Sequence, residues 1–358
     1  MINENWITLN DAFKDEAVKR ADINIDDLCV YGIKPLDDSL VCIPKNELVV
    51  IGADSGVGKT ELSLKIAQVN IKRGKKVAIY YLEGGYREAL SRMKWRDIAQ
   101  EYFKDYYKLG LDMDYRKWSL NMFCKQADID NPYKILMELE SKLWDKYKEE
   151  YKNNLMFYSG AGLTLDSFIA SLMEFHIKED TPNPFDNKIS FDIDLIIIDH
   201  LQYFSLTKSE NEIFEITEIL KTVKNITEVF NIPIILISHL RKKSKDRGLP
   251  GQEDFYGSSN IPKIASTAIT LAPSSDKDNL REGIYPTYIR VAKSRVGVKP
   301  NYAFLVDFYL DRREYSDIYD IVRLDNFGNV AENILHPEEK PKWTERKSYA
   351  ERGTENED

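Results

Sequence analysis

The sequence has few residues of the kinds that build cross-linked or metal-centred proteins. Its 358 residues include three cysteines and four histidines, and neither set has the spacing of a disulfide framework or a zinc site. No run approaches the roughly 20 apolar residues that a membrane span needs. The polar, acidic first residues lack the apolar core of a signal peptide. We therefore expect a cytoplasmic protein with no membrane segment and no structural metal.

An excess of positive charge is also absent. The formal net charge is −9, which argues against a protein that coats nucleic acid with its whole surface. It leaves open a single channel lined with basic residues. A hydrophobic fraction of 43% is enough for a sizeable core, and 358 residues suit one large domain with extensions or two modest ones.

Short apolar runs alternate with helical patterns from residue 47 onwards. Four runs predict strands that are buried on both faces, namely 47–53, 76–83, 191–199 and 231–238. Three later segments predict successive antiparallel strands, namely 287–293, 302–310 and 317–323. We expect an α/β fold, with a mostly parallel twisted sheet flanked by helices and with antiparallel strands at the C-terminal end.

The most specific motif follows the strand predicted at 47–53. The residues A-D-S-G-V-G-K-T connect it to a helix predicted at 59–72, which is the context of a phosphate-binding P-loop. Its backbone N–H groups and the helix N-terminus would hold phosphates, Lys59 would reach the β- and γ-phosphates, and Thr60 would hold Mg²⁺. The expected nucleotide-binding residues are Ala53, Asp54, Ser55, Gly56, Val57, Gly58, Lys59, Thr60 and Glu61.

Two carboxylates end predicted strands. Asp199 follows four apolar residues, as does the carboxylate that orients Mg²⁺ in P-loop enzymes. Glu83 ends the strand at 76–83, which should lie close to the P-loop strand. There Glu83 either acts as the general base that activates water, or it caps the following helix; position alone does not decide between these roles.

These motifs resemble the RecA-like motor domain of the DnaB-type hexameric replicative helicases, in order over roughly 31–325. The family P-loop has alanine where Ala53 stands, its catalytic glutamate matches Glu83 in YLE, and its Ile-Asp-Tyr-Leu-Gln run matches IDHLQ, which begins at Ile198. The resemblance implies an ATPase that uses ATP and Mg²⁺, with Arg92 contacting nucleotide. It also implies that His239, in Ser-His-Leu, senses the γ-phosphate; otherwise this histidine is a hydrogen-bonded structural residue.

The resemblance extends to a DNA-binding loop at 254–266. The matching contact positions are Tyr256, Gly257 and Ser259, although the family has charged residues at the first two. A basic run at 241–247 precedes this loop. Its first residues, Arg241, Lys242 and Lys243, either line a channel for single-stranded DNA or belong to a solvated loop.

The segment VAKSRVG resembles the family's Lys-Gln-Arg-Asn-Gly. Lys293 and Arg295 lie two apart, hence on one face of a strand. In the family this pair enters the ATP site of the neighbouring subunit and acts as an arginine finger does. The alternative is a pair of solvated strand cations. The finger interpretation requires an oligomer.

The domain organisation follows from these matches. Residues 1–30 form an arm with a short helix near 9–20, either a linker to the next subunit or a frayed surface helix. Residues 31–335 form the RecA-like motor, and 336–358 form a charged tail expected to be disordered. About 30 residues before the motor are too few for the family's primase-recruiting domain.

Three functions fit the sequence. The leading one is an ATP-driven helicase or translocase that moves on single-stranded DNA as a hexameric ring. A second is a RecA-like DNA-binding ATPase of a phage, plasmid or defence system, which loads or remodels an unknown protein partner without unwinding. A third is a scaffold that keeps nucleotide as a structural ligand; Lys59, Glu83 and Arg295 argue against it.

Overall fold

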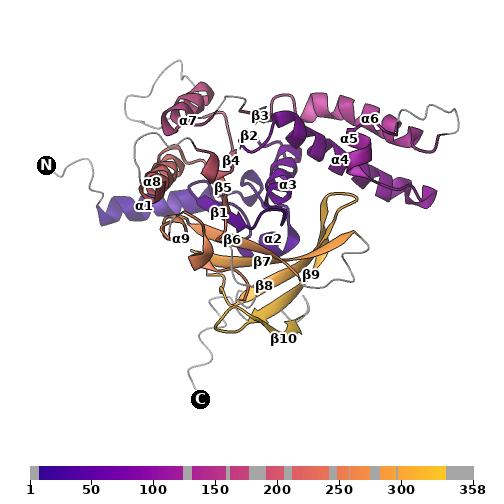
Figure 1. The fold of residues 1–358 in the computed structure, drawn as a ribbon. Coiled ribbons are helices and arrows are strands. Elements are labelled where there is room, and N and C mark those ends of the chain that lie inside the picture. The colour runs from indigo at the N-terminus through magenta and orange to yellow at the C-terminus, as the bar shows by residue number, and fades with distance from the viewer. Residues whose placement is uncertain are drawn as a thin grey trace.

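The computed structural model describes residues 8–123, 131–158, 162–176, 191–204, 212–241, 248–257, 259–274, 283–295 and 297–335. Within these ranges the strands form one sheet of ten strands in the order β10-β9-β8-β7-β6-β1-β5-β4-β2-β3 (Figure 1). The strands are β1 (Leu48–Ala53), β2 (Val77–Tyr81), β3 (Leu155–Phe157), β4 (Leu195–Asp199), β5 (Ile234–His239), β6 (Thr267–Pro273), β7 (Ile284–Ser294), β8 (Tyr302–Tyr309), β9 (Glu314–Leu324) and β10 (Val330–Leu335).

The two halves of this sheet differ in direction. The strands from β6 to β3 pair in parallel, and the strands from β6 to β10 pair in antiparallel fashion. The predicted fold class is therefore confirmed. The prediction that the strand ending at Glu83 lies close to the P-loop strand is wrong, because β5 and β4 lie between β1 and β2.

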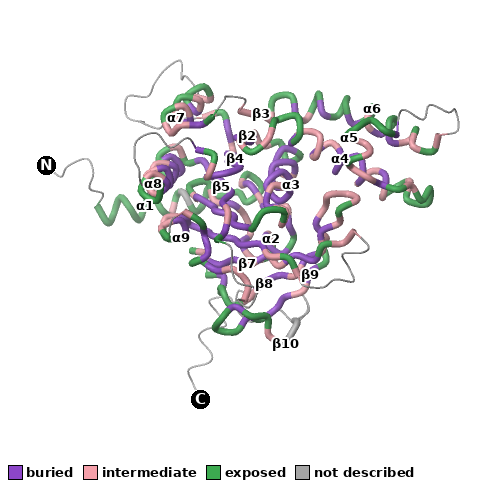
Figure 2. Tube along the Cα trace, in the orientation of Figure 1, coloured by how far each residue is buried: buried purple, intermediate pink, exposed green. Residues whose placement is uncertain are grey.

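Helices cover both faces of the parallel half. The α-helices of the described residues are α1 (Leu9–Ala21), α2 (Lys34–Leu40), α3 (Lys59–Lys72), α4 (Tyr86–Asp105), α5 (Tyr115–Ser119), α6 (Lys134–Glu150), α7 (Leu165–Leu172), α8 (Glu212–Phe230) and α9 (Ile261–Ile264), of which α1 takes no part in this cover. Alternate residues of β1 enter different cores: Val49 and Ile51 pack with α2, α3, α4 and α6, whereas Leu48 and Val50 pack with α7, α8 and α9. This two-sided burial explains the unbroken apolar run, and Figure 2 shows the buried residues concentrated in the central strands.

One strand that the sequence pattern did not predict is β6. It contains Thr267 and Thr270, which look polar in sequence but are buried. The Thr270 hydroxyl donates a hydrogen bond to the Pro250 carbonyl at 2.8 Å. Such internal partners let hydroxyl groups occupy a core strand.

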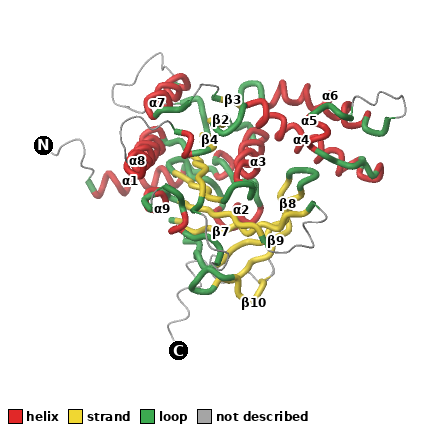
Figure 3. Tube along the Cα trace, in the orientation of Figure 1, coloured by secondary structure: helices red, strands yellow, loops and turns green. Residues whose placement is uncertain are grey.

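The helices α5 and α6 form an extension on α4, away from the strands (Figure 3). The buried Asp97 carboxylate of α4 fastens the extension, since it accepts hydrogen bonds from Tyr147 at 2.5 Å and from Lys72 of α3 at 2.6 Å. The helix α1 lies apart from the core, with the side chains of Leu9 and Phe13 exposed.

Several predictions fall outside the described residues, namely the basic positions Lys242 and Lys243 and the tail at 336–358. Among the helices that the structure describes, none has the length and apolar character of a membrane-crossing segment.

Candidate active site

The predicted phosphate, metal and sensor residues come together because parallel strands end at the same edge of the sheet. Ala53 at the end of β1 pairs with His239 at the end of β5, and Asp199 at the end of β4 pairs with Tyr81 at the end of β2. Glu83 follows β2 by two residues. The strands that separate β1 from β2 therefore contribute Asp199 and His239 to the same site.

The loop between β1 and α3 has the conformation that a phosphate cradle requires. Gly56 and Gly58 have φ angles of +81° and +100°, which side-chain-bearing residues rarely adopt. No side chain of the described residues caps the N-terminus of α3, so its first N–H groups remain available to an anion. The Lys59 side chain is buried at this point. A polyphosphate fits the cradle.

A cavity of about 380 Å³ opens in front of this loop. Part of its lining was not predicted from sequence, because it comes from the turn between β8 and β9. The lining residues are Ser55, Gly56, Gly58, Lys59, Thr60, Glu61, Tyr81, Glu83, Gly84, Glu88, Arg92, Phe308, Leu310 and Arg313.

The β8–β9 turn is fastened to this site by hydrogen bonds from α4. The Trp95 indole N–H donates to the Asp311 carbonyl at 2.8 Å, and the Arg96 guanidinium donates to the Arg313 carbonyl at 2.7 Å. The Tyr315 hydroxyl donates to the Gly58 carbonyl at 3.3 Å. No sequence signal marked this turn, because its role arises from contacts across more than 200 residues.

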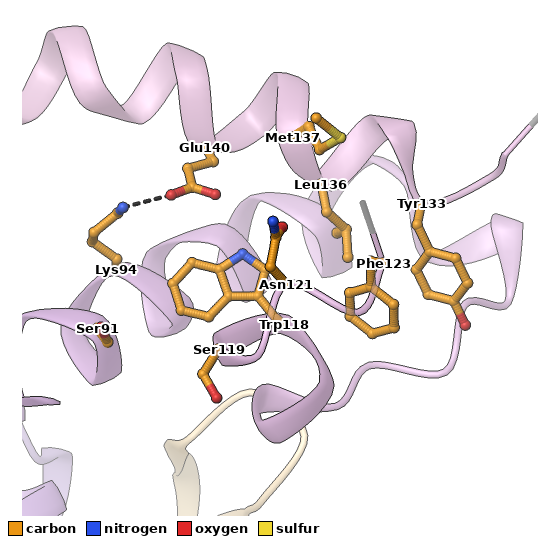
Figure 4. Close-up of a pocket in the computed structure, with 10 residues that line it drawn as sticks. All are labelled: Ser91, Lys94, Trp118, Ser119, Asn121, Phe123, Tyr133, Leu136, Met137 and Glu140. Atoms are coloured by element: carbon orange, nitrogen blue, oxygen red, sulfur yellow. Dashed lines mark hydrogen bonds and ion pairs between the residues drawn. The ribbon is translucent and has the colours of Figure 1, made fainter. Parts of the chain in front are cut away.

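A second cavity, of about 250 Å³, lies within the helical extension (Figure 4). Residues of α4, of α6 and of the segment around α5 line it, and the Lys94 ammonium of α4 pairs with the Glu140 carboxylate of α6 at 2.5 Å. None of its lining residues belongs to the cavity at the P-loop. We therefore assign it no part in nucleotide binding.

The Asp199 carboxylate is fully buried, and among the residues described neither of its oxygens has a hydrogen-bond partner. Burial raises the pKa of Asp199 to about 6; Glu83 adds to the effect, and Thr60 and Lys59 oppose it. An orphaned carboxylate beside a threonine hydroxyl matches the oxygen ligands that Mg²⁺ prefers. The residues present thus fit the implied metal, with Thr60 and Asp199 as its candidate ligands.

Two histidines lie beside the predicted base. The Nε2 atom of His200 is 3.6 Å from an oxygen of Glu83, and the His200 ring meets the His239 ring edge-on at 4.3 Å between centroids. Burial lowers the pKa of His200 to about 3 and also lowers the pKa of His239. Both imidazoles are therefore neutral at physiological pH.

Glu61 and Arg92, both predicted to bind nucleotide, are engaged with other side chains. The buried Glu61 carboxylate forms ion pairs with Arg92 at 2.8 Å, Arg96 at 2.9 Å and Arg313 at 2.8 Å. Arg92 also pairs with Glu88. The Glu61 side chain therefore balances the charge of these arginines, and Glu61, Arg92 and Arg313 all line the cavity.

The predicted DNA-loop residues lie beyond the end of β5. Arg241 and Ser259 are exposed, and the Tyr256 side chain is 44% exposed. Gly257 has a φ of +92°, and a Cβ atom there would lie 2.6 Å from Cδ1 of Ile216 on α8. The positive φ therefore favours glycine at this position, and the end of the Ile216 side chain would have to shift for a larger residue.

Lys293 and Arg295 lie at the opposite edge of the sheet from the P-loop. Lys293 pairs with Ala268 near the start of β6, and its ammonium donates hydrogen bonds to the carbonyls of Pro262 at 2.6 Å and Ala265 at 2.6 Å. Lys293 therefore caps the C-terminal end of α9 within its own chain. Arg295 follows the end of β7 and is exposed.

A known protein family matches much of this sheet and its helices. Residues 96–308, more than half of the chain, match the family described as "DnaB-like helicase C terminal domain". The chain belongs to this family. The match begins after the P-loop, so the assignment of the loop rests on the motif and the geometry above.

Relatives agree with this assignment. The chain is 25% identical over 275 residues to a "Probable plasmid replicative DNA helicase" of Chlamydia trachomatis, covering 74% of this chain and 50% of the relative. It is 25% identical over 269 residues to "Replicative DNA helicase DnaB" of Mycoplasma pneumoniae, covering 71% of this chain and 49% of that protein. The chain spans about half the length of the curated relatives it matches.

Solved structures share the fold. The chain resembles a solved ATPase domain with a TM-score of 0.63 and 18% identity, over 87% of this chain and 99% of that one. It also resembles a chain from "The Structure Of A DnaB-Like Replicative Helicase And Its Interactions With Primase", with a TM-score of 0.56 and 16% identity, over 92% of this chain and 68% of that one.

A first prediction concerns the ion pairs between Glu61 and its three arginines. Glu61→Gln should lower the free energy of unfolding by about 3–5 kcal/mol, because it leaves three largely buried arginines without their carboxylate. Glu88→Gln removes a half-exposed partner of Arg92 and should cost less than about 1 kcal/mol. Urea unfolding measures the free energy of unfolding of both variants. Equal losses in the two would contradict the stabilising role of the Glu61 ion pairs.

The buried carboxylate makes a second prediction. Without nucleotide at pH 7.5, Asp199→Asn should raise the free energy of unfolding by roughly 1–3 kcal/mol, because it removes an unpaired buried charge. The folded-state pKa near 6 exceeds the ordinary value of 3.8. The free energy of unfolding of the wild type therefore falls as pH rises between these two pKa values. The greater stability of Asp199→Asn should vanish near pH 4.

Thermal melts at pH 4 and 7.5 measure this difference, with exposed Asp166→Asn as the control. Adding Mg²⁺ and ATP at pH 7.5 should stabilise the wild type more than Asp199→Asn. A variant that is less stable than the wild type at pH 7.5 without nucleotide would contradict the interpretation.

Proposed function

We propose that this protein is an ATP-driven motor that translocates along single-stranded DNA as a ring oligomer. Lys59 and the P-loop amides hold the phosphates, Thr60 and Asp199 hold Mg²⁺, and Glu83 orients and deprotonates the attacking water. The metal, when bound, neutralises charge on the transferring phosphate. His239 senses the γ-phosphate, and Arg241, Tyr256, Gly257 and Ser259 contact the DNA.

One observation carries the proposal. A phosphate loop, an orphaned buried carboxylate and a half-exposed glutamate meet at one edge of the sheet, where the loop and the glutamate line one cavity, in a chain of the DnaB-like family. A scaffold that needed no chemistry would gain stability by replacing the unpaired Asp199. The presence of this costly carboxylate therefore favours a catalytic role.

The position of Arg295 supports action between subunits. The residue lies at the edge of the sheet opposite its own P-loop and is exposed, which favours contact with a neighbouring subunit over contact with its own nucleotide. Lys293 is different, since its ammonium already has carbonyl partners on α9. We therefore assign the finger to Arg295 alone and a structural role to Lys293.

A second candidate is a DNA-binding ATPase that loads or remodels a partner without unwinding. It is favoured by the uncharged residues at Tyr256 and Gly257, where the family has charged ones. Strand-displacement assays distinguish the two, because the second candidate predicts DNA-stimulated ATP hydrolysis without displacement.

The proposed chemistry predicts ATP hydrolysis that single-stranded DNA stimulates. Glu83→Gln should lower kcat by at least about 10²-fold, because it removes the general base, and ATP binding should persist. Glu138→Gln, an exposed glutamate on α6, is the control. Steady-state ATPase assays with and without DNA test this, and wild-type turnover that ignores DNA would contradict the motor proposal.

Sharing of sites between subunits makes another prediction. Arg295→Ala and Lys59→Ala should each abolish turnover. Rings assembled from equal amounts of the two variants should recover about one quarter of wild-type activity. That fraction is the share of interfaces that pair an intact loop with an intact finger. Lys299→Ala, an exposed lysine nearby, is the control. Mixed rings that form without any recovery would contradict action in trans.

A further inference from the structure

His200 has no role in the chemistry assigned so far, yet its environment is unusual. The ring follows Asp199 directly and is 2% exposed. Within the part of the chain that the structure describes, neither ring nitrogen has a partner in hydrogen-bond geometry, although the Gln202 side chain lies close enough to oppose the lowering of the His200 pKa. Buried polar groups are normally paired, so an unpaired imidazole beside a catalytic cavity requires an explanation.

The groups around His200 suggest one. The distance between its Nε2 atom and the Glu83 Oε2 is 3.6 Å. This separation is just beyond hydrogen-bond distance, and such contacts commonly tighten when substrate binds. An ionised carboxylate only accepts hydrogen bonds, so Nε2 has to carry the proton in this pair.

The His200 ring also contacts the sensor. His239 meets the His200 ring at 74° and 4.3 Å between centroids. The backbone carbonyl of His239 accepts a hydrogen bond from the Tyr256 N–H at 3.0 Å, at the start of the candidate DNA loop. The His239 N–H donates to Gln202 at 3.3 Å, which ties the sensor strand to the turn that carries His200.

We propose that His200 is a positioning residue that donates a hydrogen bond from Nε2 to Glu83 and transmits the position of the His239 strand to this base. The inference rests on the proposed ATPase. When the DNA loop moves, it displaces the His239 backbone, and the His200 ring shifts together with His239. This shift brings Glu83 into or out of line with the attacking water. DNA-stimulated hydrolysis therefore depends on the His200 imidazole.

Paired substitutions test this role. His200→Phe keeps an aromatic ring without nitrogen, and His200→Gln keeps a side-chain N–H. We expect His200→Phe to lower the DNA-stimulated kcat at least about tenfold, with the Kd for a fluorescent ATP analogue changing less than about twofold. His200→Gln should retain most of the activity. His200→Leu supplies the apolar comparison if the Phe variant does not fold.

A double-substitution cycle shows whether His200 acts through Glu83. In the Glu83→Gln background, His200→Phe should change the residual rate by less than about twofold, because the group that it positions is gone. If His200→Phe lowers the rate by the same factor with and without Glu83→Gln, the proposal is overturned. Equal losses in the Phe and Gln variants, or wild-type turnover in His200→Phe, would also overturn it.

Turnover of the wild type distinguishes failure of the proposed function from failure of the His200 role. If the wild type does not hydrolyse ATP with or without DNA, the proposed function fails. If it hydrolyses ATP and His200→Phe does so equally well with the same DNA stimulation, only the role of His200 fails.

Discussion

The buried Asp199 carboxylate is the constraint around which the rest of this site is arranged. Both of its oxygens lack a hydrogen-bond partner among the described residues, so the charge is costly until a cation compensates it. The surrounding groups are those that a metal–nucleotide complex needs: Thr60, the Lys59 ammonium and the open N-terminus of α3. A bound cation would offset this cost, which supports the proposal that Mg²⁺ and nucleotide bind here together.

Sheet order determines what else reaches this carboxylate. Because β4 lies between β5 and β2, the residues that follow it stand between His239, the proposed sensor, and Glu83, the proposed base. His200 fills that position. Elsewhere in the cavity wall, Glu61 and its arginines join α3, α4 and the β8–β9 turn, so the wall is cross-linked where the P-loop helix is anchored.

Much of this arrangement could be predicted from sequence because it is encoded locally. The apolar run at 47–53 became β1, and the helix predicted at 59–72 is α3. What could not be predicted depends on long-range contacts. The strand order separating β1 from β2, the buried threonines of β6 and the arginine partners of Glu61 leave no periodic signal. The hydrogen bonds from the Lys293 ammonium to α9 were likewise not predictable from its spacing in the sequence.

A crystal structure with Mg²⁺ and a slowly hydrolysed ATP analogue tests the role of Asp199 most directly. We predict phosphates on the P-loop with Lys59 at the β- and γ-phosphates, the metal between the Thr60 hydroxyl and the Asp199 carboxylate, and Glu83 facing the γ-phosphate across one water. A nucleotide bound elsewhere, or a bound nucleotide whose metal lies away from Asp199, would contradict this arrangement.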